Sequence, residues 1–207
     1  MVIAGVVMVG CATQESPSRE ERIGESKGST ALSNAPPRTG FLGDYSRLVK
    51  SSTHDNTWQE RSAQIERYKV FMVEEVKVYP KMTTGGEALD AETSAMLGDY
   101  FRTALIDSIS GAYEVTTTPG PNVASIRAAV TEIALYQAAT GVKEARMGGA
   151  AMELEVVDSI TEQRLFAVID SGSVSGYDNP PVPTQRFEHA RVTFRHWASR
   201  LLLRLRT

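Results

Sequence analysis

Cysteine, histidine and long apolar runs are scarce in this chain of 207 residues. One Cys excludes a disulfide framework, and three His leave few of the usual ligands for a metal site. No apolar run reaches the roughly 18 residues that cross a bilayer, which excludes a conventional membrane-spanning helix. The chain has 22 Lys and Arg and 25 Asp and Glu, and the resulting net charge of -3 argues against a nucleic-acid-binding protein. We expect no metal, no cofactor and no nucleic-acid partner.

Motifs of nucleophilic and phosphate-transfer enzymes are also missing. The chain has no G-x-S-x-G, no S-x-x-K and no Walker A loop. Two of the three histidines, His189 and His196, are seven positions apart on the expected last helix, roughly 10 Å of rise, which is too far to hold one metal ion unaided. The third is the isolated His54. The sequence therefore offers no catalytic residue.

The beginning of the chain carries its clearest signal. Residues 1–10 read MVIAGVVMVG, and this uncharged apolar run stops at Cys11, after which the chain becomes polar. An apolar segment before a small-residue cleavage site is typical of a secretory signal peptide, and the MVGC ending resembles the lipobox of bacterial lipoproteins. The resemblance implies cleavage before Cys11 and acylation of that residue. Ten residues are short for a signal peptide, so we expect translation to start upstream of Met1.

Acylation would hold the protein on a membrane without a spanning helix, because each buried methylene contributes about 0.8 kcal/mol. Ala12 follows Cys11 where retention in the bacterial inner membrane usually requires Asp, so the resemblance to sorted lipoproteins points to the outer membrane on its periplasmic side. The alternatives are a buried free cysteine after an apolar strand, or a soluble domain without lipid. We expect a signal peptide at 1–10, a lipidated cysteine with a disordered, Ser-, Glu- and Pro-rich linker at 11–39, and one domain at 40–207.

The domain reads as alternating strands and two helices. Apolar residues of the FLGDYSRL stretch at 41–48 are expected to attach a leading segment to the domain. A long strand is expected at 68–79, short of Pro80, followed by a helix from Asp90 to Gly111 whose apolar residues recur every fourth position. Strands are expected at 113–117 and at 124–136, where a helix is the alternative, and 150–157 and 165–169 are expected to form a hairpin. The final helix begins near Arg186, with an apolar stripe at 187, 190, 194, 197 and 201.

These elements predict an α+β fold. We expect a mainly antiparallel sheet of about five strands, with both helices packed on one face and the order β-α-β-β-β-β-α. The first strand, the first helix and the next strand could form a βα unit that returns to the same sheet, with the meander beyond it.

Several segments together resemble a family of proteobacterial lipoproteins grouped as domain of unknown function 3313. The resemblance rests on FLGDYSRL at 41–48, YKVFMVEEVKVY at 68–79, GAYEVTTTPGPNVASIRAAVTEI at 111–133 and DSITEQRLFAVIDS at 158–171. One departure is Glu162, where the pattern leads us to expect Gly after Thr161. The family implies a location and an architecture, and it brings no activity.

Carboxylates and arginines supply the remaining candidate residues. Glu74 and Glu75 should point to opposite faces of their strand, and Glu153 and Glu155 should share a solvent-facing side. The last helix is rich in arginine, with residues 186, 191, 195, 200, 204 and 206. The cluster is explained either by solvation and the helix dipole or by a docking face.

Two functions follow from these candidates. In the first, a non-catalytic domain of an envelope lipoprotein uses Arg191, Arg195 and Arg200 to bind an envelope protein or an anionic envelope component. In the second, an enzyme acts on an envelope polymer through carboxylates near Glu74, Glu75 or Asp170. The sequence favours the first.

Overall fold

The computed structural model describes residues 38–52, 54, 56–79, 89–137, 145–173 and 188–206. All of them belong to one compact unit, Asn34–Thr207. The expected signal peptide, Cys11 and most of the expected linker lie outside the described residues. In the part of the chain that is described, neither helix is long and apolar enough to cross a membrane.

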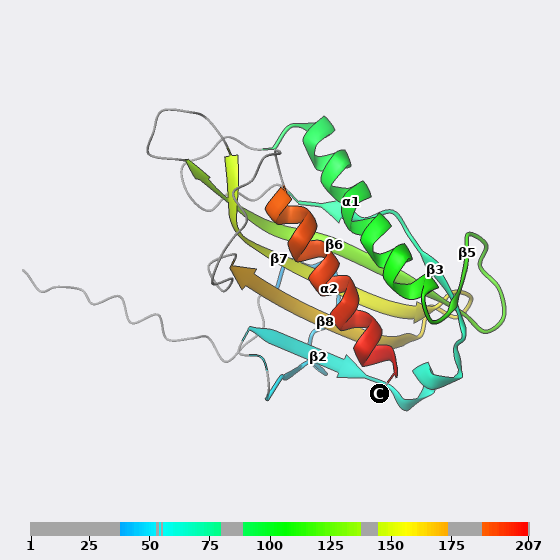
Figure 1. Cartoon of the computed structure of the whole chain (residues 1–207). Helices are drawn as coiled ribbons and strands as arrows, with labels where there is room; N and C mark the ends of the chain where they lie inside the picture. Colours follow the sequence, from blue (N-terminus) through cyan, green and yellow to red (C-terminus); the bar gives the residue numbers. More distant parts are fainter. Residues whose placement is uncertain are drawn as a thin grey trace, which may run out of the picture. The chain divides into compact units, whose positions relative to one another are not determined.

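One mixed sheet of eight strands organises the domain (Figure 1). Its strands run, from one edge to the other, in the order β1 (Val49–Lys50), β2 (Thr57–Arg61), β8 (Arg164–Ser173), β7 (Ala145–Asp158), β6 (Val123–Gln137), β3 (Val70–Val73) and β5 (Glu114–Thr116), and β4 (Lys77–Val78) also pairs with β6. The neighbours from β1 to β6 are antiparallel, whereas β3 is parallel to both β5 and β6. The helices α1 (Ala91–Ser110) and α2 (Glu188–Arg206) lie side by side across one face.

The α+β class is confirmed, but the expectation of about five mainly antiparallel strands is wrong. The leading strands β1 and β2 precede the first strand that the sequence predicts. They escape a pattern search because β1 has only two residues and β2 reads TWQER, which does not look apolar. The parallel part arises because α1 carries the chain from β3 to β5 in the same sheet, as the expected βα unit requires.

The expected long strand at 68–79 is interrupted. Val73 pairs with Ile126 and Lys77 pairs with Ala129, so β3 and β4 have one residue more than the facing part of β6. The extra residue makes a bulge around Glu74 and changes the phase of the strand, because the buried positions are Phe71 and Val73 and then Val76. The bulge is the feature around which one of the candidate sites is built.

A second irregularity explains why the period-two pattern of β6 fails near its end. Val130 pairs with Met152 and Glu132 pairs with Ala151, which leaves Thr131 as an extra residue in β6. The buried positions therefore pass from Val130 to Ile133. The sequence pattern predicts one continuous buried face that is interrupted at position 132. The bulge instead shifts the alternation by one residue, so that the buried face continues at Ile133.

Helix α1 begins and ends as predicted. The Asp90 carboxylate accepts a hydrogen bond of 2.6 Å from the Thr93 amide, and Gly111 is the C-terminal cap. The four expected core positions Leu97, Phe101, Leu105 and Ile109 are all fully buried. Close packing is tightest at Gly98, where an added Cβ would lie 2.8 Å from the Val76 carbonyl oxygen. The helix therefore rests directly on the backbone between β3 and β4.

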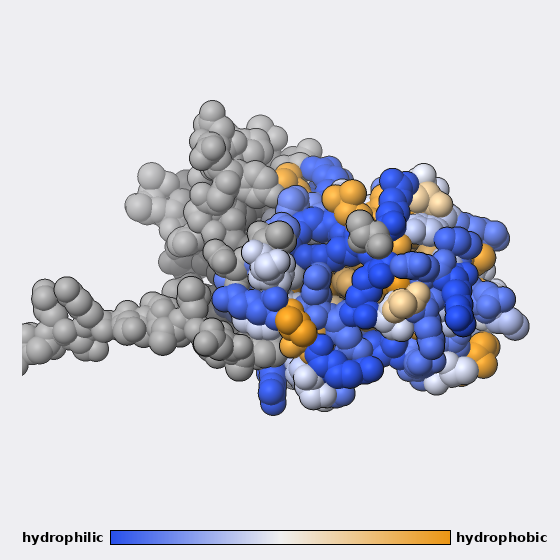
Figure 2. Space-filling model, turned by 90° about the horizontal axis from the view of Figure 1, so that it is seen from below, coloured by the Kyte–Doolittle hydropathy of each residue, from blue (hydrophilic) through white to orange (hydrophobic). Residues whose placement is uncertain are grey.

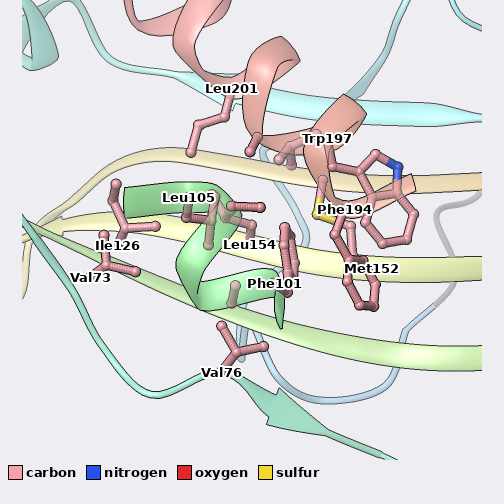
Figure 3. Close-up of a cluster of buried hydrophobic side chains, with 14 of the residues drawn as sticks. Val73, Val76, Phe101, Leu105, Ile126, Met152, Leu154, Phe194, Trp197 and Leu201 are labelled. Carbon is pink, nitrogen blue, oxygen red and sulfur yellow. The ribbon is translucent and has the colours of Figure 1, made fainter. Parts of the chain in front are cut away.

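The helix-side core lies between the two helices and the sheet. The rings of Phe101 and Phe194 stack with centroids 5.0 Å apart, and Trp197 lies 5.7 Å from the ring centroid of Phe101 (Figure 3). The sheet contributes the alternating residues of β7, including Met152 and Leu154. The predicted stripe of α2 is confirmed at 190, 194, 197 and 201, and its Phe187 lies outside the described residues.

The opposite face of the sheet has a second, smaller apolar cluster. It is formed by Leu42, Tyr45, Trp58, Ala167 and Ile169, with partly buried Phe41 and Leu48 against it. Its cover is the leading segment, residues 38–48, which has no regular secondary structure. The predicted attachment of this segment is confirmed. Seen from below the view of Figure 1, the described surface is mostly hydrophilic, with scattered apolar residues (Figure 2).

Candidate functional site

A buried carboxylate on the central strand β7 holds the leading segment. Glu153 has only 1% of its surface exposed, and it accepts hydrogen bonds from the Thr39 amide at 3.0 Å and the Thr39 hydroxyl at 2.8 Å. It also accepts bonds from the Leu42 amide at 3.3 Å and the Tyr45 hydroxyl at 2.7 Å. One carboxylate thus satisfies four donors of a segment that has no ladder of its own.

Tyr45 extends this arrangement back into the leading segment. Its hydroxyl accepts a hydrogen bond of 2.8 Å from the Gly40 amide while it donates to Glu153. Burial, together with this bond to a carboxylate, raises the pKa of the Tyr45 hydroxyl. The phenol is therefore a fixed donor across the physiological range of pH.

Arg164 of β8 is the second attachment. Its guanidinium donates to the carbonyl of Leu42 and, at 2.7 Å, to that of Asp44, while Nε donates to Glu155 at 3.0 Å. The expectation that Glu153 and Glu155 are solvent-facing is wrong for Glu153, because the leading segment covers that part of the sheet. The sequence shows Glu153 only as an acidic residue between the apolar Met152 and Leu154, a pattern that Glu155 shares.

Arg200, the third member of the expected docking face, points toward the sheet. Its Nη1 lies 2.7 Å from the carboxylate of Asp170, which is 2% exposed, and its Nη2 donates to the Thr57 hydroxyl at 3.2 Å. Burial raises the pKa of Asp170, and the charges of Arg200 and Arg204 oppose that rise. This arginine therefore neutralises a buried carboxylate between α2 and β8.

Arg191 and Arg195 lie elsewhere on α2, beside α1. The Arg191 guanidinium lies 4.8 Å from the centroid of the Tyr100 ring, a cation–π contact. A hollow of about 280 Å³ between the helices, the helix hollow, is lined by Tyr100, Thr103, Ala104, Asp107, Arg191 and Arg195. The structure thus separates these two arginines from Arg200.

The carboxylates considered for an enzyme do not meet in one place. Glu74 and Glu75 line a hollow of about 410 Å³ beside the β3–β4 bulge, the bulge hollow, whereas Asp170 lies under α2. Glu74 accepts from the Ser125 hydroxyl and, at 2.8 Å, from Nε of Arg127. The bulge interrupts the regular alternation of the strand at Glu74, and both glutamates line this hollow.

Of the three histidines, the structure describes the side chains of His54 and His196. Within the described ranges, no group of three or more His, Cys, Asp or Glu residues is arranged to hold an ion. Burial and the positive charge of Arg200 lower the pKa values of His54 and His196, which lie near the Arg200–Asp170 pair. The side chain of His189 is not among those described.

Comparison with known families identifies the domain. Residues 37–201 match the model of a protein family of unknown function, DUF3313. The chain belongs to this family. The match covers the leading segment, the whole sheet and most of α2, so membership in DUF3313 extends over the described domain and confirms the resemblance seen in the sequence.

Solved structures offer more distant likenesses to this DUF3313 domain. The PelC dodecamer of Paraburkholderia phytofirmans is 11% identical, with a TM-score of 0.42 over 69% of this chain and 96% of that one. A DUF4136 family protein from Bacteroides thetaiotaomicron is 7% identical, with a TM-score of 0.41 over 78% and 98% of the two chains. A DUF330 protein from Xanthomonas campestris is 10% identical, with a TM-score of 0.39 over 67% and 81%. No curated protein matches the chain.

Proposed function

We propose that this DUF3313 protein is an outer-membrane lipoprotein that faces the periplasm, with Cys11 acylated and a non-catalytic binding domain at 40–207. The lipobox-like MVGC at 8–11 supports acylation, and Ala12 supports transfer to the outer membrane. The polar residues up to 39 would serve as a tether between the lipid and the domain.

The observation that carries this proposal is the attachment of the leading segment. A tethered domain is held through its N-terminal end, and here the first residues of the domain are bonded to the middle of the sheet. Thr39 and Tyr45 reach Glu153 of β7, and Arg164 of β8 holds the carbonyls of the same segment. The domain would therefore keep its structure up to the point where the tether begins.

The mass of the mature protein tests the lipid anchor. The gene would be expressed with its genomic upstream region, and the intact mass of the membrane-fraction protein measured. We expect an N-terminus at Cys11 that carries acyl chains, and loss of this species in the control variant Cys11→Ala. A protein that retains residues 1–10 without modification would contradict the proposal and the location that rests on it.

The helix hollow is the proposed contact with an acidic envelope partner. Arg191 and Arg195 line it together with the ring of Tyr100, and arginine binds carboxylates and phosphates through two parallel bonds. Arg200, which the sequence grouped with them, would act indirectly by holding the C-terminal half of α2 to β8.

Vesicle sedimentation tests this contact. Vesicles containing an anionic phospholipid should retain Cys11→Ala protein at low salt, and Arg191→Glu with Arg195→Glu should abolish retention. Arg206→Glu, on an exposed residue of the same helix, makes the same change of charge as Arg191→Glu alone and is the control for that single variant. An equal loss of vesicle retention in the control would show that the total charge of α2 binds the vesicles, and that the helix hollow is not the binding site.

A further inference from the structure

The bulge hollow lies on the face of the sheet that carries the leading segment. It is lined by Gly40 and Phe41 of that segment, by residues 74, 75, 77 and 79 around the bulge, and by residues 127, 128 and 155 of β6 and β7. Its volume of about 410 Å³ is within the range of pockets that hold small organic ligands. Both β-bulge geometry and the attachment of the leading segment are needed to form it.

The charged groups in the bulge hollow are largely paired with one another. Arg127 binds Glu74 at 2.8 Å and also holds the exposed carboxylate of Glu162. Glu155 is paired with Arg164 at 3.0 Å. Glu75 and Lys77 add one charge of each sign. The hollow therefore has little surplus charge with which to attract an ion, but it presents carboxylate and guanidinium planes in fixed orientations.

Two aromatic rings flank these polar planes. Phe41 packs against the smaller apolar cluster, and the Lys77 ammonium lies 5.9 Å from its ring centroid. Tyr79 follows β4 and has 43% of its surface exposed, which makes it one of the exposed large hydrophobic residues. Rings beside fixed polar groups suit a ligand with both a C–H face and many hydroxyls.

We propose that the bulge hollow binds a neutral saccharide unit of a glycan. The sugar's C–H face would lie against Tyr79 or Phe41, and its hydroxyl groups would bond to Glu75, Lys77 and the free lone pairs of Glu74. Binding at this place is separate from the helix hollow on the other face. It does not require the lipid anchor, so the test below distinguishes its failure from failure of the proposed function.

Nuclear magnetic resonance of the full-length chain with Cys11→Ala tests the site, with the trisaccharide of N-acetylglucosamine as the probe. We expect millimolar binding and shifts confined to amides near residues 74–79 and 125–129. Tyr79→Ala should weaken binding about fivefold, the loss expected for one aromatic contact. Glu75→Gln should weaken it about threefold, the loss expected for one hydrogen bond.

The matched controls are Ile160→Ala and Glu114→Gln, which alter an exposed apolar and an exposed acidic residue away from the hollow. Both should bind the trisaccharide as the parent does. Absence of localised shifts, or equal weakening in the controls, would overturn the proposal. Tighter, salt-sensitive binding of spermidine at the same amides would also overturn it, because the site would then select a cation.

Discussion

The two faces of the sheet are covered in different ways. The helix-side face is covered by α1 and α2, whose large side chains interlock in one core that includes Phe101, Phe194 and Trp197. The opposite face is covered by the leading segment, whose own apolar cluster is small and is joined to the sheet by Glu153 and Arg164. A helix satisfies its own backbone, whereas an irregular segment needs acceptors and donors from the sheet beneath it.

This difference predicts two modes of failure. Loss of volume on the helix side removes contacts from the main core, so the whole domain should become less stable. Loss of a polar anchor on the other face should release the leading segment while the rest stays folded, because stability differs between regions with few and with many buried contacts.

The largest effect is expected for Phe101→Ala. This side chain is fully buried and contacts rings from α2. Its removal should lower the free energy of unfolding by about 3 to 5 kcal/mol, through lost transfer energy and a cavity. Urea denaturation followed by circular dichroism should show one transition at lower urea. A normal midpoint would mean that the helices do not share a cooperative core with the sheet.

The next largest effect is expected for Glu153→Ala. The free energy needed to detach the leading segment should fall by about 2 kcal/mol, because the donors of that segment lose their acceptor. Hydrogen exchange should accelerate at the Leu42 amide and stay slow in α1. Glu114→Ala, which removes an exposed carboxylate from the edge strand β5, is the control. If exchange in α1 accelerates as much as in the leading segment, the two faces unfold as one unit and the comparison fails.

A smaller loss, about 1 kcal/mol, is expected for Gly98→Ala. The added Cβ would lie 2.8 Å from the Val76 carbonyl oxygen, and such overpacking destabilises a protein by about 1 to 3 kcal/mol. The higher helix propensity of Ala offsets up to about 1 kcal/mol of this loss. Gly111→Ala is the control, because its nearest atom would be 3.6 Å away. Thermal melting should separate the two variants. A Gly98→Ala variant as stable as the parent would show that α1 can move off the bulge.

Most of the helix-side face could be predicted from the sequence. Period-two alternation in β7, the four-residue spacing in α1 and the stripe of α2 each reflect one buried surface, which a pattern records directly. The caps Asp90 and Gly111 were likewise readable, because they act on neighbouring backbone groups. These are local rules, and the residues that obey them lie close in sequence.

The opposite face was predictable only at its apolar residues. Glu153 and Thr39 are 114 positions apart, and no spacing rule connects a strand carboxylate to a distant segment. The bulges at Glu74 and Thr131 were also missed, because an inserted residue is defined by the partner strand and not by the strand itself. Arg200 faces Asp170 because of the way α2 packs on the sheet, which the sequence of the helix alone does not show.

Acid should weaken the helix-side face through His54 and His196. Burial and nearby Arg200 lower both pKa values in the folded state, so folding favours neutral imidazole. The two histidines therefore contribute to the free energy of unfolding above the unfolded-state pKa of about 6.5. This stabilisation is lost as the pH falls through their lower folded-state pKa values. His196→Gln should therefore flatten the fall in melting temperature between about pH 7.5 and 5. An unchanged slope would assign the fall to other groups, such as the carboxylates.

The smallest effect is expected at Glu162, at the β7–β8 turn. Its φ of 61° is left-handed, which explains why the sequence pattern favours Gly there. Glu162→Gly should remove about 1 kcal/mol of backbone strain but lose an exposed ion pair with Arg127 that contributes about 0 to 1 kcal/mol. Denaturation should thus show a net gain of a few tenths of a kcal/mol. In an Arg127→Ala background, where the pair is already absent, the gain should approach the full strain. An equal gain in both backgrounds would show that the exposed pair contributes nothing, which would leave buried Glu153 and Arg164 as the polar anchors that matter on this face.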